Sequence, residues 1–552
     1  MARIAKNSLY LALLLVAAAC LRLYHIRFGE PFLYHPDEIK LVAQAGRLLS
    51  THFTDITAYF AIGVYPPFFT YLLTLPIGLY IVVNFLTGRF STPADVTQFY
   101  NLSPFPFFFI SRLLVAFMGV FSVWLLYRLV KRLYSERVAW IASALLAFNF
   151  LHIQQSHYAT VDLPASLFAL LAVSSAVSLL EKPRPLHYFT SALFAAMALA
   201  TKFSLFFAVA PALYAHLCHA KDSGWSWNKI FNRRLFLLAA TLVIAFLLFC
   251  PLFVLDFNQT KQGLQGTGQF EKEGKLGSGG SLLSYWTGDQ SEGFGVFYPN
   301  DFLDTLGPVL MAITLVGLFL MVRRHQRADL LLLSFALLTY FMFEYVAYKA
   351  IRHLLPVLPF LMVAAALALE SIAIRLSRQA ERRNAVLLGM VLALATAQSI
   401  RSCRYFNELA KPDPRTISRA WILQNIPAHS RIMTESFPPA LPDCRDVRPD
   451  SLRCYHLSSL KLSSRRLNLT PEFISALRDF RAQYYLADGF SRVFFDWKHS
   501  YKKYPQVVQE RKQFFAWLEV NAKRLQTFKP SDPRLQPEIV LYQLPVFDGG
   551  VD

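Results

Sequence analysis

Charged residues are scarce in this sequence. Asp, Glu, Lys and Arg make up 16% of its 552 residues, and hydrophobic residues make up 55%. A soluble domain carries about 25% charged residues, and several apolar runs here exceed the roughly 18 residues that span a bilayer as a helix. The sequence therefore predicts an α-helical polytopic membrane protein and excludes an ordinary soluble enzyme.

Cysteine is scarce as well, with six in the chain, which is too few for a scaffold held together by disulfides. Cys444 and Cys454 lie close together in the polar C-terminal region. A disulfide between them is consistent with a location outside the cytoplasm, and two free thiols are equally consistent with the sequence. Tight spacing of His, Cys and carboxylate residues is also lacking, so we expect no metal cofactor.

The net charge of +19 is distributed as a signal of membrane topology. Lys and Arg cluster in short segments between the apolar runs, which is typical of loops that stay in the cytoplasm. With those segments inside, the chain forms about eleven transmembrane helices, its N-terminus lies in the cytoplasm and its C-terminal region lies outside. We therefore expect the protein to interact with the lipid bilayer through these basic segments and not to bind nucleic acid.

The composition changes near the end of the last apolar run. Residues 1–402 contain every run of spanning length and form the predicted membrane domain. Residues 25–105 form its first outer loop, in which Pro76 interrupts an apolar run and favours interfacial or re-entrant helices. Residues 256–300 form a second outer loop that is rich in glycine. Its length is typical of a binding loop and also fits a plain connection.

Residues 403–552 lack an apolar run of spanning length, and we predict a soluble α/β domain outside the membrane. Asp413 precedes Pro414 at the start of a predicted helix, and Pro427 follows its end. Runs of strand-forming residues then occur at three places, namely 431–433, 483–487 and 538–544.

Polar side chains gather at the outer ends of the predicted membrane helices. They come from segments far apart in the chain: Asp37, Glu38, Arg112, His157, Asp162, Lys202, Tyr348, Arg352 and His353. Each has an ordinary explanation by itself, because loop carboxylates are solvated, cations extend to lipid headgroups and Asp162 can cap the next helix. Together they suit a substrate with a phosphate and with a hydroxyl or amine to be deprotonated.

Short motifs in this order resemble those of the GT-C glycosyltransferases. They are His35-Pro36-Asp37-Glu38, Tyr65-Pro66-Pro67, Arg112-Leu113-Leu114, His157 to Asp162, Ala200-Thr201-Lys202 and Arg352 to Pro356. The similarity is to the bacterial branch related to protein O-mannosyltransferases and the lipid A aminoarabinose transferase (glycosyltransferase family 39-like). The C-terminal region also resembles the periplasmic domains of that branch.

The resemblance implies an inverting transfer of a sugar from a polyprenyl-phosphate-linked donor. The acceptor would be a protein, lipid or glycan at the periplasmic face of a bacterial inner membrane. Asp37 would be the general base or would position the acceptor, with Glu38 beside it, and Asp162 would match the second acidic position. Lys202 and Arg352 would lie near the lipid phosphate.

The same resemblance departs from the aminoarabinose transferases at one position. Tyr65 stands where they carry Lys before the Pro-Pro pair, which argues against lipid A as the acceptor. We expect the substrates to contact a further set of side chains: Tyr65, Arg112, His157, Tyr348 and His353.

The alternative function is a flippase or transporter for lipid-linked sugars. Such proteins carry ionisable groups near the bilayer midplane and often contain broken helices and inverted repeats. The predicted charges lie at one face and repeats are lacking, which favours the enzyme. A noncatalytic relative whose outer domain recruits a partner is a third interpretation, and the intact acids argue against it.

Overall fold

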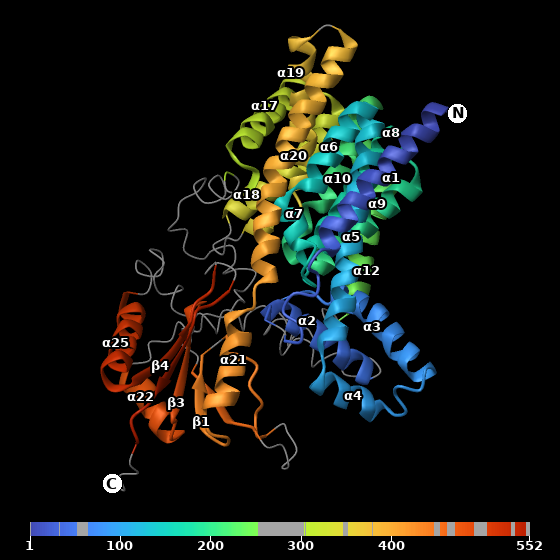
Figure 1. The fold of residues 1–552 in the computed structure, drawn as a ribbon. Coiled ribbons are helices and arrows are strands. Elements are labelled where there is room, and N and C mark those ends of the chain that lie inside the picture. The colour runs from blue at the N-terminus through green and yellow to red at the C-terminus, as the bar shows by residue number, and fades with distance from the viewer. Residues whose placement is uncertain are drawn as a thin grey trace. The chain divides into compact units, whose positions relative to one another are not determined.

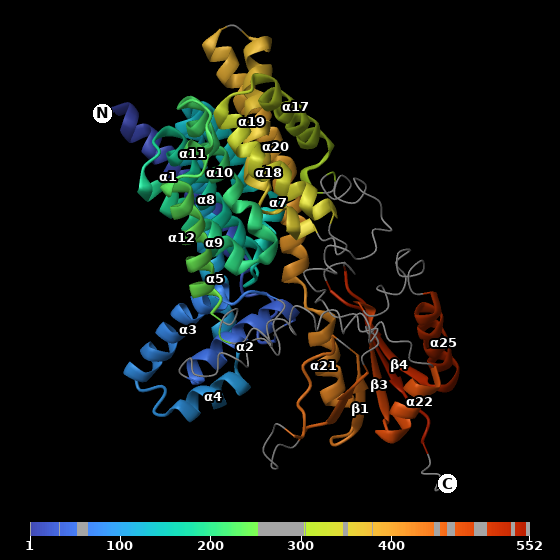
Figure 2. The ribbon, with the colours of Figure 1, turned by 180° about the vertical axis from the view of Figure 1, so that it is seen from behind.

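The computed structural model describes residues 2–32, 34–51, 65–251, 255, 303, 305–345, 351–377, 379–435, 437–445, 453–460, 470–490, 505–531 and 536–547. These residues form two compact units. The first takes in the described residues up to Arg27 and those from His35 to Phe406. The second takes in Phe28–Tyr34 and the described residues from Asn407 onward. Figures 1 and 2 show both from opposite sides.

The first unit is built from helices. In chain order they are α1 (Ala2–Leu23), α2 (Pro36–Ser50), α3 (Phe68–Leu86), α4 (Pro93–Leu102), α5 (Phe105–Leu133), α6 (Glu136–Phe148), α7 (Phe150–Gln155), α8 (Asp162–Glu181), α9 (Pro185–Thr201), η2 (Phe203–Val209), α10 (Ala210–Asp222), α11 (Trp227–Ile230), α12 (Arg233–Phe249), α17 (Pro308–Arg324), α18 (Arg327–Tyr345), η3 (Ile351–Leu354), α19 (Leu358–Leu376) and α20 (Ala380–Ala410).

Length and composition make six helical stretches among the described residues long and apolar enough to cross a membrane. They are Phe68–Leu86, Phe105–Leu133, Asp162–Glu181, Phe203–Asp222, Leu358–Leu376 and Ala380–Asn425. The predicted multi-pass helical architecture is confirmed, whereas the number of eleven spans stays a prediction. Helices α8 and α19 are the most enclosed of these stretches, because most of their side chains are buried.

Helix α3 corrects one expectation from the sequence. Pro76 was expected to interrupt this apolar run, but it lies inside a continuous helix of 19 residues. A proline removes one backbone hydrogen bond, and the side chains of Phe69, Leu73 and Ile77 are buried along one side of the helix. Packing of this face therefore outweighs the local break. Helices α2, α3 and α4 lie together at one end of the helical bundle (Figures 1 and 2).

A break between α6 and α7 directs the chain toward that same end. Asn149 ends α6 and accepts a hydrogen bond from the backbone N–H of His152, at 3.1 Å, which starts α7. The buried guanidinium of Arg22 donates to the carbonyl of Ala147 at 3.1 Å, at the end of α6. It also lies 2.8 Å from Nδ1 of His152. Because the positive charge lies at a helix C-terminus, the helix dipole stabilises it.

The second unit is a sheet between helices. Its strands are β1 (Arg431–Thr434), β2 (His456–Ser459), β3 (Tyr484–Asp488), β4 (Lys523–Phe528) and β5 (Ile539–Gln543), and its helices are α21 (Pro414–Asn425), α22 (Thr470–Asp479) and α25 (Pro505–Asn521). The strand order is β2-β1-β3-β5-β4. Strands β2, β1 and β3 are parallel, and β5 is antiparallel to both of its neighbours. Helix α21 packs on one face, and α22 and α25 pack on the other.

The predicted α/β region is therefore present, with Asp413 as the N-cap of α21. Strands β1, β3 and β5 were predicted. Strands β2 and β4 were not, because neither carries a run of apolar residues that stands out from its surroundings. The open question about Cys444 and Cys454 is also answered, since a disulfide joins them.

Candidate active site

The start of α2 carries two adjacent acids. His35 is the N-cap, Pro36 is the first helical residue, and Asp37 and Glu38 follow in the first turn. Proline suits this position because the first amides of a helix have no partner within it. The same unpaired amides stabilise negative charge. The local sequence thus holds two carboxylates at the positive end of a helix.

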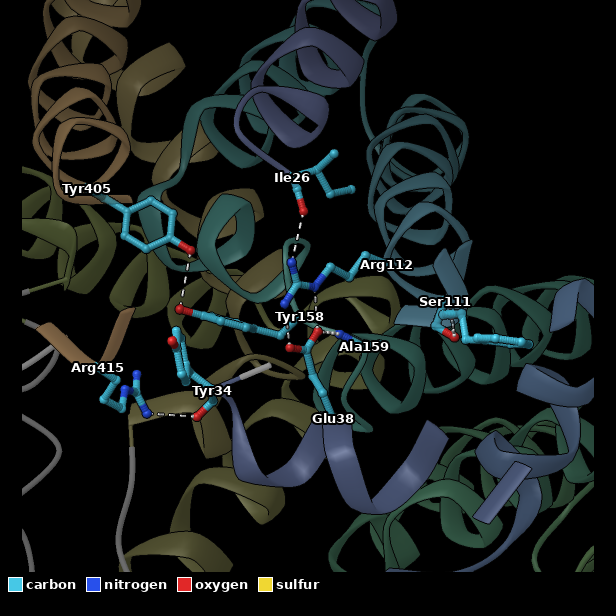
Figure 3. Close-up of polar contacts among 10 residues, drawn as sticks. Ile26, Tyr34, Glu38, Ser111, Arg112, Tyr158, Ala159, Tyr405 and Arg415 are labelled. Carbon is cyan, nitrogen blue, oxygen red and sulfur yellow. Dashed lines mark hydrogen bonds and ion pairs between the residues drawn. The ribbon is translucent and has the colours of Figure 1, made fainter. Parts of the chain in front are cut away.

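Glu38 is buried, and both of its carboxylate oxygens accept hydrogen bonds. Arg112 of α5 donates from Nε to Oε1 and from Nη2 to Oε2, both at 2.8 Å. The backbone N–H of Ala159 donates to Oε1 at 2.8 Å, and Arg112 also reaches the carbonyl of Ile26 at 3.0 Å (Figure 3). Burial opposes ionisation of Glu38, but the charge and hydrogen bonds of Arg112, together with His35 and the amide of Ala159, outweigh it and lower the pKa. The ionised carboxylate therefore ties α2 to α5 and to the segment before α8.

Asp37 makes longer contacts than its neighbour. Its Oδ2 accepts a hydrogen bond from the Tyr65 hydroxyl at 3.5 Å. The same oxygen lies 3.8 Å from Nη2 of Arg352, and 15% of the Asp37 side chain is exposed. A carboxylate held this loosely is available to an incoming proton donor.

A second acid, Asp162, lies close to two cations. It is the first residue of α8, and Val161 is the N-cap, so the interpretation of Asp162 as a helix cap is wrong. Its Oδ1 accepts a hydrogen bond from Nζ of Lys202 at 2.6 Å. Its Oδ2 lies 3.6 Å from Nε of Arg352. Lys202 lies at the junction of α9 and η2, where the helix ends at Thr201.

These contacts link four charged side chains in the order Asp37, Arg352, Asp162 and Lys202. Lys202 is 7% exposed and Arg112 is 1% exposed, so neither extends to the headgroups as the alternative interpretation required. The Arg352 side chain is 29% exposed and bridges the two acids. This row of side chains therefore contains a partly accessible carboxylate, Asp37, and two cations, Arg352 and Lys202, that can bind an anion.

The remaining candidates have different surroundings. Nε2 of His157 lies 2.9 Å from the carbonyl of Tyr24, and Nδ1 lies 2.8 Å from that of Ile153. Burial lowers the pKa of His157 to about 4, although both backbone contacts favour the protonated form. His353 is buried and stacks on Phe343 with the ring centroids 5.2 Å apart.

Tyr348 and the glycine-rich loop at 256–300 lie outside the described residues. Of the predicted site, the structure thus brings together Asp37, Asp162, Lys202, Arg352 and Tyr65, with Glu38 and Arg112 as a separate buried pair.

Two family models match parts of the chain. The dolichyl-phosphate-mannose-protein mannosyltransferase model matches residues 100–254, and the Alg9-like mannosyltransferase model matches residues 291–411. The fold is similar to that of ArnT from Cupriavidus metallidurans in the apo state, with a TM-score of 0.54 and 13% identity over 98% of both chains. The chain is a membrane glycosyltransferase of the GT-C fold.

Further solved structures share the fold of this glycosyltransferase. ArnT from Cupriavidus metallidurans bound to undecaprenyl phosphate has a TM-score of 0.51 and 12% identity, over 96% of this chain and 98% of that chain. The Archaeoglobus fulgidus oligosaccharyltransferase in the apo form has a TM-score of 0.51 and 13% identity, over 87% of this chain and 69% of that chain. Identities this low show a shared fold. No curated protein matches the sequence.

The sequence interpretation of this glycosyltransferase missed several supporting groups. The amide of Ala159 holds Glu38, the hydroxyls of Tyr158 and Tyr405 lie 3.3 Å apart, and Arg22 holds the end of α6. A backbone amide carries no sequence signal. Arg22 did carry one, because a cation at the predicted outer end of the first apolar run departs from the positive-inside pattern.

Proposed function

We propose that this glycosyltransferase takes a sugar from a polyprenyl-phosphate-linked donor and transfers it, with inversion, to an acceptor outside the cytoplasm. Support for a lipid-phosphate donor comes from two proteins of similar fold. ArnT from Cupriavidus metallidurans binds undecaprenyl phosphate, and AglB from Archaeoglobus fulgidus binds dolichol phosphate together with an inhibitory peptide. The acceptor is a protein, lipid or glycan.

The proposed reaction is a single displacement at the anomeric carbon. The acceptor hydroxyl or amine loses its proton to the Asp37 carboxylate as it attacks, and the bond between the anomeric carbon and the phosphate oxygen breaks. The bonding electrons leave with the polyprenyl phosphate, and Arg352 and Lys202 stabilise the added negative charge. Attack opposite to the leaving group inverts the configuration.

The observation that carries the proposal is the row of Asp37, Arg352, Asp162 and Lys202. Successive members of this row lie within 3.8 Å of each other, so a base and two cations belong to one connected group, as this reaction needs. Asp162 then orients the two cations. Glu38, with both oxygens bound by Arg112, acts as a positioning residue that fixes the start of α2 beside Asp37.

The membrane placement is part of the proposal. Residues 1–402 form the catalytic domain with about eleven spans, and residues 25–105 and 256–300 are its outer loops. The N-terminus lies in the cytoplasm, and residues 403–552 lie in the periplasm of a bacterium, with the enzyme in the inner membrane. The basic segments between helices support this, including Arg323 and Arg324 at the end of α17.

The test uses three purified proteins: wild type, Asp37→Asn and, as control, Asp222→Asn. Asp222 is an exposed acid paired with Arg327. Each receives radiolabelled polyprenyl-phosphate sugars and a total envelope extract. We expect label in a new acceptor with wild type and the control, and not with Asp37→Asn. Movement of intact labelled lipid across liposomes, with no transferred label from any donor, would contradict the proposal and favour a flippase.

A further inference from the structure

The second unit brings together four side chains that are good metal ligands. Ligand atoms of His429, Cys444 and His456 all lie within 4.8 Å of one another. Cys454 is joined to Cys444 by the disulfide, and the Sγ atoms of both cysteines lie 3.6 Å from Nδ1 of His429. The two histidines are exposed, so an ion in solution has access to the group.

Backbone hydrogen bonds hold these four residues close together in addition to the disulfide. The N–H of His429 donates to the carbonyl of Cys454 at 2.7 Å, and the N–H of Cys444 donates to that of Tyr455 at 2.9 Å. The N–H of His456 donates to the carbonyl of Ser430 at 3.0 Å. Cys454 and His456 flank the buried Tyr455, and alternate residues of an extended chain point to the same side.

The backbone at His429 gives a second observation. This residue has a φ of 63°, in the left-handed region, where a side chain with a Cβ is disfavoured and glycine is preferred. Strained residues of this kind are concentrated at functional sites. Nδ1 of His429 lies 3.6 Å from the sulfur atoms of both cysteines, so this ring is their shared neighbour.

Two of the distances in this group match tetrahedral zinc coordination. Zn–S bonds of about 2.3 Å and Zn–N bonds of about 2.0–2.1 Å at a tetrahedral angle place sulfur and nitrogen about 3.6 Å apart. In the disulfide form, each sulfur already lies at this distance from Nδ1 of His429. Two sulfur ligands of one zinc ion would lie about 3.8 Å apart, which a covalent disulfide forbids. Metal binding therefore requires the disulfide to be broken.

We propose that reduced Cys444 and Cys454, with His429 and His456, form a Cys₂His₂ site for a thiophilic divalent cation of the zinc type. A dithiol reductant supplies two electrons and two protons to the disulfide and is itself oxidised to a disulfide. The two thiols lose their protons on binding the ion, and the metal keeps its oxidation state. Re-oxidation by a disulfide oxidant, which accepts the two electrons and is reduced to a dithiol, re-forms the Cys444–Cys454 bond and expels the ion, so the disulfide and the metal exclude each other.

The test uses the full-length protein in detergent, with Co²⁺ as the spectroscopic probe. The reduced protein, treated with a phosphine reductant, is expected to bind one Co²⁺ per chain, with the visible bands of tetrahedral cobalt and thiolate charge-transfer bands. Zn²⁺ should displace the bound Co²⁺ and remove both sets of bands. The oxidised protein should bind no Co²⁺ at this group and should show neither set of bands. Absence of these bands from the reduced wild type would overturn the proposal.

Variants assign the ligands. Cys444→Ser with Cys454→Ser should abolish the thiolate bands, whereas Cys403→Ser, at an exposed free cysteine, should not change them. His456→Ala keeps both cysteines, so its oxidised form tests folding by gel filtration, and its reduced form should bind Co²⁺ at least tenfold more weakly. Unchanged cobalt affinity in His456→Ala, or unchanged bands in the double serine variant, would contradict the site.

Discussion

Arg112 binds both carboxylate oxygens of Glu38, each at 2.8 Å, and both side chains are only 1% exposed. The preceding acid, Asp37, has its Oδ2 3.8 Å from Nη2 of Arg352. Two neighbouring carboxylates in one helical turn therefore have different environments. In the proposed reaction, the buried one holds the start of α2 in place and the accessible one accepts the proton.

The first prediction concerns this buried ion pair. Glu38→Gln leaves the Arg112 charge buried without its counter-charge, which should lower the free energy of unfolding by about 3–5 kcal/mol. The matched control is Glu181→Gln, which breaks the exposed pair with Arg132 and should cost about 0–1 kcal/mol. Thermal unfolding in detergent measures both.

The double variant Glu38→Gln with Arg112→Gln sharpens this test. Removing both charges should cost less than the sum of the two single changes, because each single change leaves an unpaired buried charge. Additive costs would show that the two side chains do not depend on each other in the folded protein.

The second prediction concerns pH. The pKa of Glu38 is lower in the folded protein than in the unfolded chain, so the ionised form stabilises the fold. This contribution is complete above the unfolded pKa, about 4.3, and is lost as the pH falls through the folded pKa. The melting temperature of wild type should therefore fall more steeply on acidification below about pH 4.3 than that of Glu38→Gln. Parallel curves would contradict the assignment.

The third prediction concerns Arg352. Arg352→Gln removes a donor to the developing phosphate charge and should lower the transfer rate about 10²- to 10³-fold. The side chain is 29% exposed, so the melting temperature should change little. Arg327→Gln, which breaks an exposed pair with Asp222, is the control and should keep full activity. An unchanged rate and an unchanged donor KM in Arg352→Gln would exclude the role.

The fourth prediction concerns the segment before α2. Arg415 of α21 is buried, stacks on the Tyr34 ring at 3.9 Å and donates to the Tyr34 carbonyl at 3.3 Å (Figure 3). The Tyr34 hydroxyl lies 2.7 Å from Oγ1 of Thr416. Tyr34 directly precedes His35, the N-cap of α2, so these contacts hold the chain segment that leads into this helix.

Arg415→Ala should therefore lower the transfer rate about tenfold or more, since small displacements of a reacting group have large effects on rate. Arg419→Ala removes a more distant contact, on Phe32 at 4.6 Å, and should have a smaller effect. Initial rates at saturating donor measure both. Equal rates in Arg415→Ala and wild type would show that this segment does not position α2.

Much of the site could be predicted from the sequence, because membrane topology restricts where the ends of helices lie. Asp37, Asp162, Lys202 and Arg352 were selected since each follows or precedes an apolar run at the predicted outer face. Their pairing in one row follows from the packing of helices that are distant in sequence. The pairing of Glu38 with Arg112, 74 residues apart, had no local signal.

Other features could not be predicted from the sequence, for identifiable reasons. Pro76 was expected to break its helix, but the buried face of α3 keeps the helix intact. The group of His429, Cys444, Cys454 and His456 lacks the spacing of a known metal motif, and the pairing of β1 with β2 brings it together. Sequence spacing detects a metal site only when its ligands are local.

The central claim is that Asp37 is the general base. The decisive measurement is the kcat of Asp37→Asn at saturating polyprenyl-phosphate-sugar donor, with the dissociation constant of the donor determined separately. The account predicts that kcat falls about 100-fold or more, while donor affinity and melting temperature stay close to those of wild type. A kcat equal to that of wild type would contradict it and would transfer the role to Asp162.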